Sequence, residues 1–316
     1  MNAFHHDAWK VWREAASGKR MHHGWILAGR QGLGKRAFAD KAARELLGAD
    51  LSQEHHPDIL LLTYGPKDEK EEKKRADGKD FELARSIRIN QIREMQRRLT
   101  TRPTLGDNRV VIIDPADDME RNASNALLKS LEEPPQGTYF LLVTHRPAQL
   151  LPTIRSRCRV LRFNPLGQDA LLQELRTSIP DTDAAALAEA VQFAGGSPGS
   201  ARQFVEQDLG AVAKVMRAML DQGDRTLGGR GELADRIGTR PDRERLQAIL
   251  TLARNLTADA ATHAEPTKRI ALIEAHSELV ALTRQAPTFN FDPGLLALEI
   301  GTLLANAGAA SERAHG

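Results

Sequence analysis

A glycine-rich loop between an apolar run and a helical pattern constrains the fold of this chain more than any other feature. The run Gly24–Ala28 is typical of a buried strand, and residues 36–47 have helical periodicity. The residues between them follow the pattern G-x-x-x-x-G-K through Gly29, Gly32, Gly34 and Lys35. Such a loop can surround phosphates with backbone N–H groups and a lysine at a helix N-terminus. The stretch therefore predicts a strand, a phosphate-binding type of loop and a helix.

Two departures from this pattern argue against catalysis. The position after the loop lysine usually carries a hydroxyl that binds Mg²⁺, and here it is Arg36, which has no lone pair for a metal. Asp114 ends an apolar strand pattern where a carboxylate usually faces the metal, but Pro115 follows it in place of a glutamate that would activate water. We therefore expect no ATP hydrolysis by this chain. The loop either still binds ATP or ADP or serves as a degenerate structural turn.

Two further aspartates, Asp117 and Asp118, follow the same strand pattern. Carboxylates just before a helix accept hydrogen bonds from its first N–H groups and interact favourably with the helix dipole. We expect these aspartates to cap a helix that begins near Met119.

Four apolar runs alternate with helical patterns in the first half of the chain. They cover residues 24–28, 55–62, 110–113 and 138–144. Strands and helices that alternate at this spacing predict a parallel, doubly wound sheet. After Asn164 only periodic segments rich in alanine and leucine occur. The sequence thus predicts an α/β domain over residues 1–164, a small helical domain over 165–208 and an all-α domain over 209–316.

The composition of the chain bears on its expected partners, location and metal content. The net charge is +2, so no global excess of positive charge favours nucleic-acid binding. No run of about 18 apolar residues is present, and the N-terminus lacks the apolar core of a signal peptide, so we expect a cytoplasmic protein without a membrane partner. Cys158 is the only cysteine, which excludes intrachain disulfides and a multi-cysteine zinc site. We expect no metal, and no cofactor is required.

Charged residues are concentrated in two stretches. Residues 67–80 contain six basic and six acidic side chains, which we interpret as a solvated, mobile insertion, with a partner-binding element as the alternative. In the next helical pattern, Arg93 and Arg97 lie one turn apart and Arg98 and Arg102 extend the basic zone. These arginines form either an ordinary solvated helix face or a helix that contacts nucleic-acid phosphates.

The stretch from Asn125 to Phe163 carries a fixed cation next to the single cysteine. A helical pattern is stopped by two prolines, an apolar run rich in β-branched and aromatic residues follows, and a short segment then reaches Ser156-Arg157-Cys158. The motifs GRQGLGKR, HPD, VVIIDPAD, NALLKSLEEPP, TIRSRC and GGSPGSAR occur in this order. Together they resemble the bacterial clamp-loader AAA+ family, and the resemblance covers about residues 24–202.

The resemblance implies a fold and a set of roles. The fold is a RecA-like AAA+ domain with a parallel sheet, followed by a small helical lid and a helical collar through which subunits assemble. Arg157 matches an arginine finger that acts in trans on the ATP site of a neighbouring subunit, and Thr144 and Arg202 match the two sensor positions of a nucleotide site. Many family members carry a four-cysteine zinc module that is absent here. The implied partners are the gamma/tau and delta subunits of the loader, the sliding clamp and primed DNA.

Three functions remain open at this level. In the first, the chain is a non-hydrolysing subunit of a DNA polymerase III clamp loader, with neither polymerase nor ATPase activity of its own. In the second, it is a gamma/tau-type motor that hydrolyses ATP, against which Arg36 and Pro115 argue. In the third, it is a stand-alone DNA-binding module that uses Arg93, Arg97 and Arg98, against which the nearly neutral charge argues.

Overall fold

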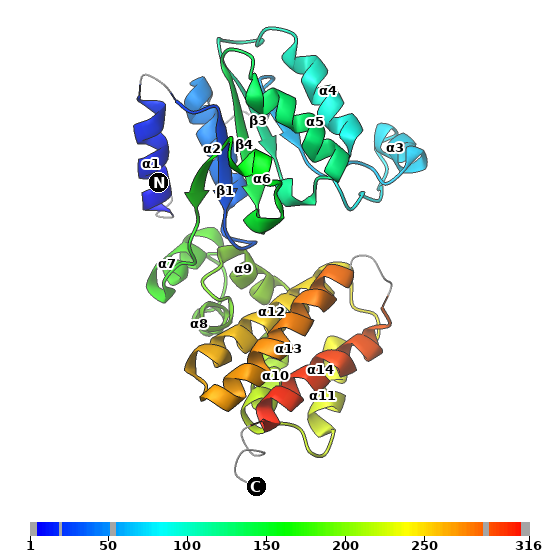
Figure 1. The fold of residues 1–316 in the computed structure, drawn as a ribbon. Helices are drawn as coiled ribbons and strands as arrows, with labels where there is room; N and C mark the ends of the chain where they lie inside the picture. Colours follow the sequence, from blue (N-terminus) through cyan, green and yellow to red (C-terminus); the bar gives the residue numbers. More distant parts are fainter. Residues whose placement is uncertain (1–4, 19–20, 51–54, 287–290, 311–316) are drawn as a thin grey trace. The chain divides into compact units, whose positions relative to one another are not determined.

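The computed structural model describes residues 5–18, 21–50, 55–286 and 291–310. The chain divides between Asn164 and Pro165 into two compact units (Figure 1). Each unit is described by itself.

The first unit is built on a five-stranded sheet. Its strands are β1 (Gly24–Ala28), β2 (Ile59–Leu62), β3 (Arg109–Ile113), β4 (Thr138–Thr144) and β5 (Arg159–Arg162). All pairs are parallel, in the order β2-β3-β4-β1-β5. Every residue of β1 and β3 is buried, as expected of strands covered on both faces. The predicted parallel α/β domain is confirmed.

Helices cover both faces of this sheet (Figure 1). On one face, α1 (His6–Ala16) and α2 (Lys35–Leu47) share a core with alternate strand residues, in which the Trp12 and Trp25 rings meet edge to face at 5.5 Å. On the other face, α4 (Ile89–Leu99), α5 (Arg121–Glu132) and the short α6 (Pro152–Arg155) bury the remaining strand side chains. Because the strands are parallel, their carboxyl ends share one edge, where ligands of such sheets bind.

The charged stretch at residues 67–80 is solvent-exposed as predicted, apart from Glu71 and Lys74, but it contains a helix that the sequence analysis did not predict. Residues Glu69–Ala76 form α3, whose first turn is capped by the Asp68 side chain. Glu71 is buried, pairs with Lys74 at 2.8 Å and accepts the backbone N–H of Glu82 at 2.7 Å. The balanced charges therefore act as local helix pairs, and the one buried carboxylate ties the helix to the returning chain.

The second unit is all-helical in its described part. It contains α7 (Gln168–Ser178), α8 (Ala184–Phe193), α9 (Pro198–Glu206), α10 (Gly210–Gln222), α11 (Gly228–Ile237), α12 (Arg243–His263), α13 (Pro266–Gln285) and α14 (Pro293–Ala309). A single cluster of buried side chains runs from Leu171 to Ala307. The segments predicted as a lid (165–208) and a collar (209–316) thus share one core.

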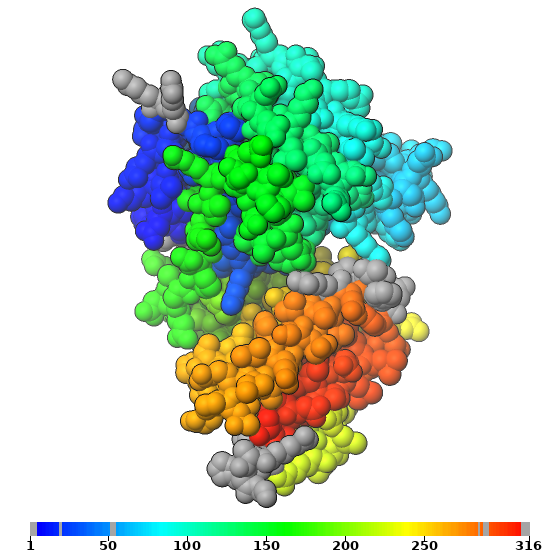
Figure 2. All heavy atoms as spheres, in the orientation of Figure 1, coloured from blue at the N-terminus to red at the C-terminus, as the bar shows by residue number. Residues whose placement is uncertain are grey.

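Helices α13 and α14 lie side by side at the surface of this unit, orange and red in Figure 2. Four large apolar side chains on them are exposed to solvent: Ile270, Ile273, Leu295 and Leu298. No helix among the described residues is long and apolar enough to cross a membrane.

Close packing of α10 against α14 makes Gly308 sensitive to substitution. A methyl group on Gly308 would lie 2.1 Å from the carbonyl oxygen of Met219. We expect Gly308→Ala to lower the free energy of unfolding by about 1–3 kcal/mol, because the two helices must separate.

The matched control is Gly301→Ala on the same helix. The nearest neighbours of its methyl group are side-chain atoms of Arg230 and Met219, at 3.1 and 3.3 Å, which can move. This change should be neutral or slightly stabilising, since glycine disfavours a helix interior. Thermal unfolding followed by circular dichroism compares the two variants, and equal effects would contradict the packing argument.

Candidate functional site

The glycine loop lies between β1 and α2, as predicted. Gly32 and Gly34 have φ angles of 78° and 74°, which side-chain-bearing residues rarely adopt. A Cβ at Gly29 would lie 2.5 Å from the carbonyl oxygen of Phe163. All three glycines are therefore needed for the shape of the loop.

Lys35 closes this loop on itself. Its side chain is buried, and Nζ donates hydrogen bonds to the carbonyl oxygens of Gly29 at 2.7 Å and Arg30 at 2.5 Å. Burial lowers the pKa of Lys35 to about 8, although the charges of Asp114 and Asp117 oppose this effect. A phosphate entering the loop would have to compete with two carbonyl groups for this ammonium.

A guanidinium lies where a magnesium site would need a hydroxyl. Arg36 Nη1 is 3.7 Å from a carboxylate oxygen of Asp114, and its Nε lies 2.9 Å from Asp40. Burial raises the pKa of Asp114, while the charges of Arg36 and Lys35 oppose the increase. These residues do not fit Mg²⁺, because the hydroxyl ligand is missing and a cation already pairs with the carboxylate.

The strand ends next to the loop hold an ionic cluster that the sequence did not predict. Asp117 accepts hydrogen bonds from the His145 backbone N–H and from Arg146 Nε, both at 3.0 Å. Asp118 accepts hydrogen bonds from Arg146 Nη2 at 2.5 Å and from the Tyr64 hydroxyl. Burial alone would raise the pKa of Asp117, but the His145 N–H and the Arg146 guanidinium hold it below its usual value.

The prediction that Asp117 and Asp118 cap the next helix is therefore wrong. Helix α5 begins at Arg121 after Glu120, whereas the aspartates belong to a short 3₁₀ turn, η1 (Ala116–Asp118). This turn directs both carboxylates to the end of β4, where Arg146 offers a stronger, charged partner than a helix N–H. The sequence signal that could have indicated this pairing is Arg146, a cation two residues after the end of β4.

Thr144 lies at the carboxyl end of β4, opposite Ala28 in the register of the sheet. It is fully buried, and its hydroxyl oxygen accepts the Arg146 backbone N–H at 3.2 Å. Burial and the charge of Lys35 lower the pKa of the adjacent His145 to about 4, so its imidazole is neutral at pH 7. The structure thus brings the loop, Asp114 and Thr144 to one edge of the sheet.

Arg157 lies outside this group, between α6 and β5. Its Nη2 pairs with Glu132 at 2.8 Å, and its Nη1 donates to the Thr153 carbonyl oxygen at 3.0 Å. About a third of its side chain is exposed (36%). Arg202 lies on α9 of the second unit, where its charge acts on Glu174.

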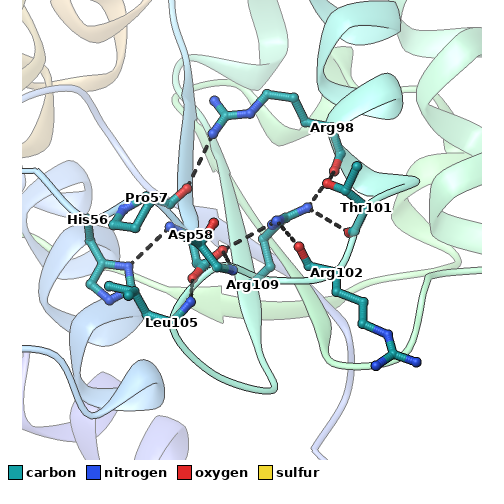
Figure 3. Close-up of polar contacts among 9 residues, drawn as sticks. His56, Pro57, Asp58, Arg98, Thr101, Arg102, Leu105 and Arg109 are labelled. Atoms are coloured by element: carbon teal, nitrogen blue, oxygen red, sulfur yellow. Dashed lines mark hydrogen bonds and ion pairs between the residues drawn. The ribbon is translucent and has the colours of Figure 1, made fainter.

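The predicted basic zone is split. Arg93 and Arg97 are exposed on one face of α4, next to Asn90, Gln96 and Thr100, and Arg97 also pairs with Glu94. Arg98 instead donates to the Pro57 carbonyl oxygen at 3.3 Å, on the side where Asp58 and Arg109 meet (Figure 3). Two of the three arginines proposed to contact nucleic acid therefore share a surface.

The described residues contain no group of three His, Cys, Asp or Glu side chains placed to hold a metal ion. The isolated Cys158 thiol is partly buried, and burial raises its pKa to about 12. It is therefore protonated at pH 7 and a poor nucleophile.

Comparisons with known proteins find subunits of DNA polymerase III. The DNA polymerase III subunit delta' of Pseudomonas aeruginosa is 35% identical over 67% of this chain and 66% of its own length. The DNA polymerase III subunit tau/gamma of Haemophilus influenzae is 30% identical over 61% of this chain and 28% of its own length. A solved DNA polymerase III gamma subunit-related protein from Thermotoga maritima aligns with 96% of this chain and 99% of its own, at a TM-score of 0.45 and 21% identity.

The chain thus spans two thirds or less of the length of the curated relatives with which it is compared. The family described as "DNA polymerase III, delta subunit" matches residues 4–167, which include the whole sheet, the glycine loop and Arg157. This chain therefore belongs to the DNA polymerase III delta subunit family.

Proposed function

We propose that this chain is the delta-prime-type subunit of a bacterial DNA polymerase III clamp loader, a cytoplasmic AAA+ member that does not hydrolyse ATP. It supplies Arg157 in trans to the ATP site of a neighbouring subunit and so helps load the sliding clamp onto primed DNA. The observation that carries the proposal is the pairing of Arg36 with Asp114. A cation stands in place of the missing hydroxyl and lies 3.7 Å from the carboxylate that would face a metal, which argues against hydrolysis at the chain's own site. Arg157 supports a role in trans because it lies outside that site, between α6 and β5.

The proposed partners are the gamma/tau and delta subunits, the clamp and primed DNA. Exposed apolar side chains on α13 and α14 support assembly through the second unit, since such patches mark protein contacts. The exposed face of α4 that carries Arg93 and Arg97 is the proposed contact with DNA phosphates within the assembled loader. Arg98 has a smaller part in this proposal, because its guanidinium is engaged by Pro57.

The experiment that tests the proposal is reconstitution. The purified chain is mixed with gamma/tau and delta subunits, and assembly is followed by size-exclusion chromatography. ATP turnover is then measured for the isolated chain and for the complex. Assembly without turnover by the isolated chain is the expected result; failure to assemble would contradict the proposed role.

A gamma/tau-type motor is the second candidate. It is favoured by the intact loop glycines and Lys35 and by the similarity to a tau/gamma subunit. Magnesium-dependent ATP turnover by the isolated chain would support the motor and exclude the first proposal.

Nucleotide binding by the loop provides a further prediction. Arg36 pairs with Asp114, the carboxylate that would face a metal. The isolated chain should therefore bind ATP or ADP with the same affinity in the presence of Mg²⁺ as in the presence of EDTA. In Arg36→Thr the hydroxyl returns and Asp114 is freed, so Mg²⁺ should strengthen binding without restoring hydrolysis, since Pro115 offers no base. Titration calorimetry measures both affinities.

Arg36→Ala is the matched control, because it frees Asp114 but adds no hydroxyl. Its response to Mg²⁺ should be weaker than that of Arg36→Thr. Strong Mg²⁺ dependence in the unchanged chain would show that Arg36 does not replace the metal.

A further inference from the structure

The ion pair between Glu132 and Arg157 joins two parts of the chain that are separate in sequence. Glu132 is the last residue of α5, and Arg157 follows α6. We propose that Glu132 is a positioning residue, which holds the Arg157 guanidinium in the orientation in which it meets the phosphates of a neighbouring subunit's nucleotide. This inference rests on the proposed function, because it gives Glu132 a role only if Arg157 acts in trans.

The position of Glu132 is unfavourable for α5 itself. A carboxylate at the C-terminus of a helix lies near the negative end of the helix dipole. The guanidinium at 2.8 Å compensates this charge. The following Glu133 forms no ion pair among the described residues, so the pairing is specific to one of two adjacent glutamates.

The contacts of Arg157 fix its direction but leave donors open. A guanidinium has five N–H groups in a planar fork. Nη2 faces Glu132, while Nη1 faces the Thr153 carbonyl oxygen at 3.0 Å and the Ser156 hydroxyl at 3.4 Å. Its Nε–H has no partner among the described residues. A side chain held in this way loses less conformational freedom when it contacts a phosphate.

The ion pair between Glu132 and Arg157 contributes little to the stability of the fold. Both side chains are more than a third exposed, at 36% and 49%. Solvent-exposed ion pairs add little to the stability of a fold. Replacing Glu132 should therefore change the behaviour of Arg157 without unfolding the chain.

The test uses assembled loaders that contain Glu132→Gln, the matched control Glu133→Gln, Arg157→Ala, or Glu132→Gln with Arg157→Ala. The difference in ATP turnover between the unchanged loader and Arg157→Ala defines the Arg157-dependent part. Glu132→Gln should reduce kcat for this part by about two- to tenfold, the range expected for releasing one long side chain. The KM for ATP should be unchanged, and Glu133→Gln should match the unchanged loader.

The other possible results distinguish a failure of the proposed function from a failure of this inference. Full turnover with Arg157→Ala would overturn the proposed function and this inference together. A loss with Arg157→Ala but none with Glu132→Gln, or a rise in kcat, would overturn the inference alone. A further loss when Glu132→Gln is added to Arg157→Ala would show that Glu132 does not act through Arg157. Glu132→Asp is the second variant; because it keeps the charge, it should retain more turnover than Glu132→Gln, and equal loss would also overturn the inference.

Discussion

Replacing Asp58 with alanine should lower the free energy of unfolding of the α/β unit by about 3–5 kcal/mol, the usual cost of removing one partner of a buried ion pair. Asp58 is fully buried and lies 3.3 Å from Arg109 Nη2. Its carboxylate also accepts the backbone N–H group of Thr104 at 2.7 Å. It accepts the backbone N–H group of Leu105 at 2.8 Å (Figure 3). The variant leaves a buried guanidinium and two N–H groups without this acceptor.

The same carboxylate gives the stability a pH dependence. Burial alone would raise the pKa of Asp58, but the Thr104 and Leu105 N–H groups and Arg109 hold it below its usual value. A carboxyl group with a lowered pKa in the folded state stabilises the fold above its unfolded pKa of about 4. This contribution should be fully present at pH 7 and be lost as the pH falls below about 4. The Asp58→Ala variant should lack that part of the acid dependence.

Urea unfolding followed by tryptophan fluorescence is the measurement, because all three tryptophans of the chain lie within its first 25 residues and report on this unit. Asp107→Ala is the control, since that aspartate is exposed in the same loop and should change stability by no more than about 0.5 kcal/mol. Equal changes in the free energy of unfolding for the two variants would show that the buried pair of Asp58 and Arg109 does not stabilise this unit.

Local sequence patterns predicted four of the five strands and the glycine loop. The fifth strand, β5, was not among the predicted runs, because only one of its four residues is buried. The strand ending at Ala28, the loop and the helix beginning at Lys35 are continuous in the chain, so periodicity and glycine positions identify them directly. Asp114 and Thr144 follow or end two neighbouring strands, β3 and β4, and the carboxyl ends of parallel strands share one edge.

Pairings between distant side chains were not predictable in this way. Asp58 and Arg109 are 51 residues apart, and only the register of β2 against β3 brings them together. Arg146 likewise meets Asp117 only because η1 turns back toward the end of β4. Sequence spacing shows which charges are available, while their partners depend on tertiary contacts.

The helix in the charged insertion was not predicted either, for a different reason. Composition alone favours disorder there, because a segment with few apolar residues buries little surface. Specific contacts that composition does not show hold this helix. Asp68 caps its first turn, Glu71 is buried and accepts the backbone N–H of Glu82, and Lys67 pairs with the Glu82 carboxylate.

The second large effect concerns the proposed neighbour in the loader. Replacing Arg157 with alanine should slow hydrolysis at the one ATP site that receives it by about 10³-fold or more, the effect of removing an arginine finger. The guanidinium stabilises charge that develops on the transferred phosphoryl group, so the loss should fall on kcat rather than on ATP affinity. ATP turnover by the whole loader should fall by the fraction that this one site contributes. Clamp loading onto primed DNA should decrease as well.

Two further variants test whether the effect is specific to the guanidinium of Arg157. Arg159→Ala is the matched control, because Arg159 is exposed on β5 two residues away and carries the same charge. Arg157→Lys keeps the charge but loses the planar fork, so it should recover only part of the turnover. If the Arg159 control slows the loader as much as Arg157→Ala does, general positive charge at this edge is responsible. If Arg157→Ala changes neither turnover nor clamp loading, Arg157 serves no neighbouring site, and its proposed role in trans is overturned.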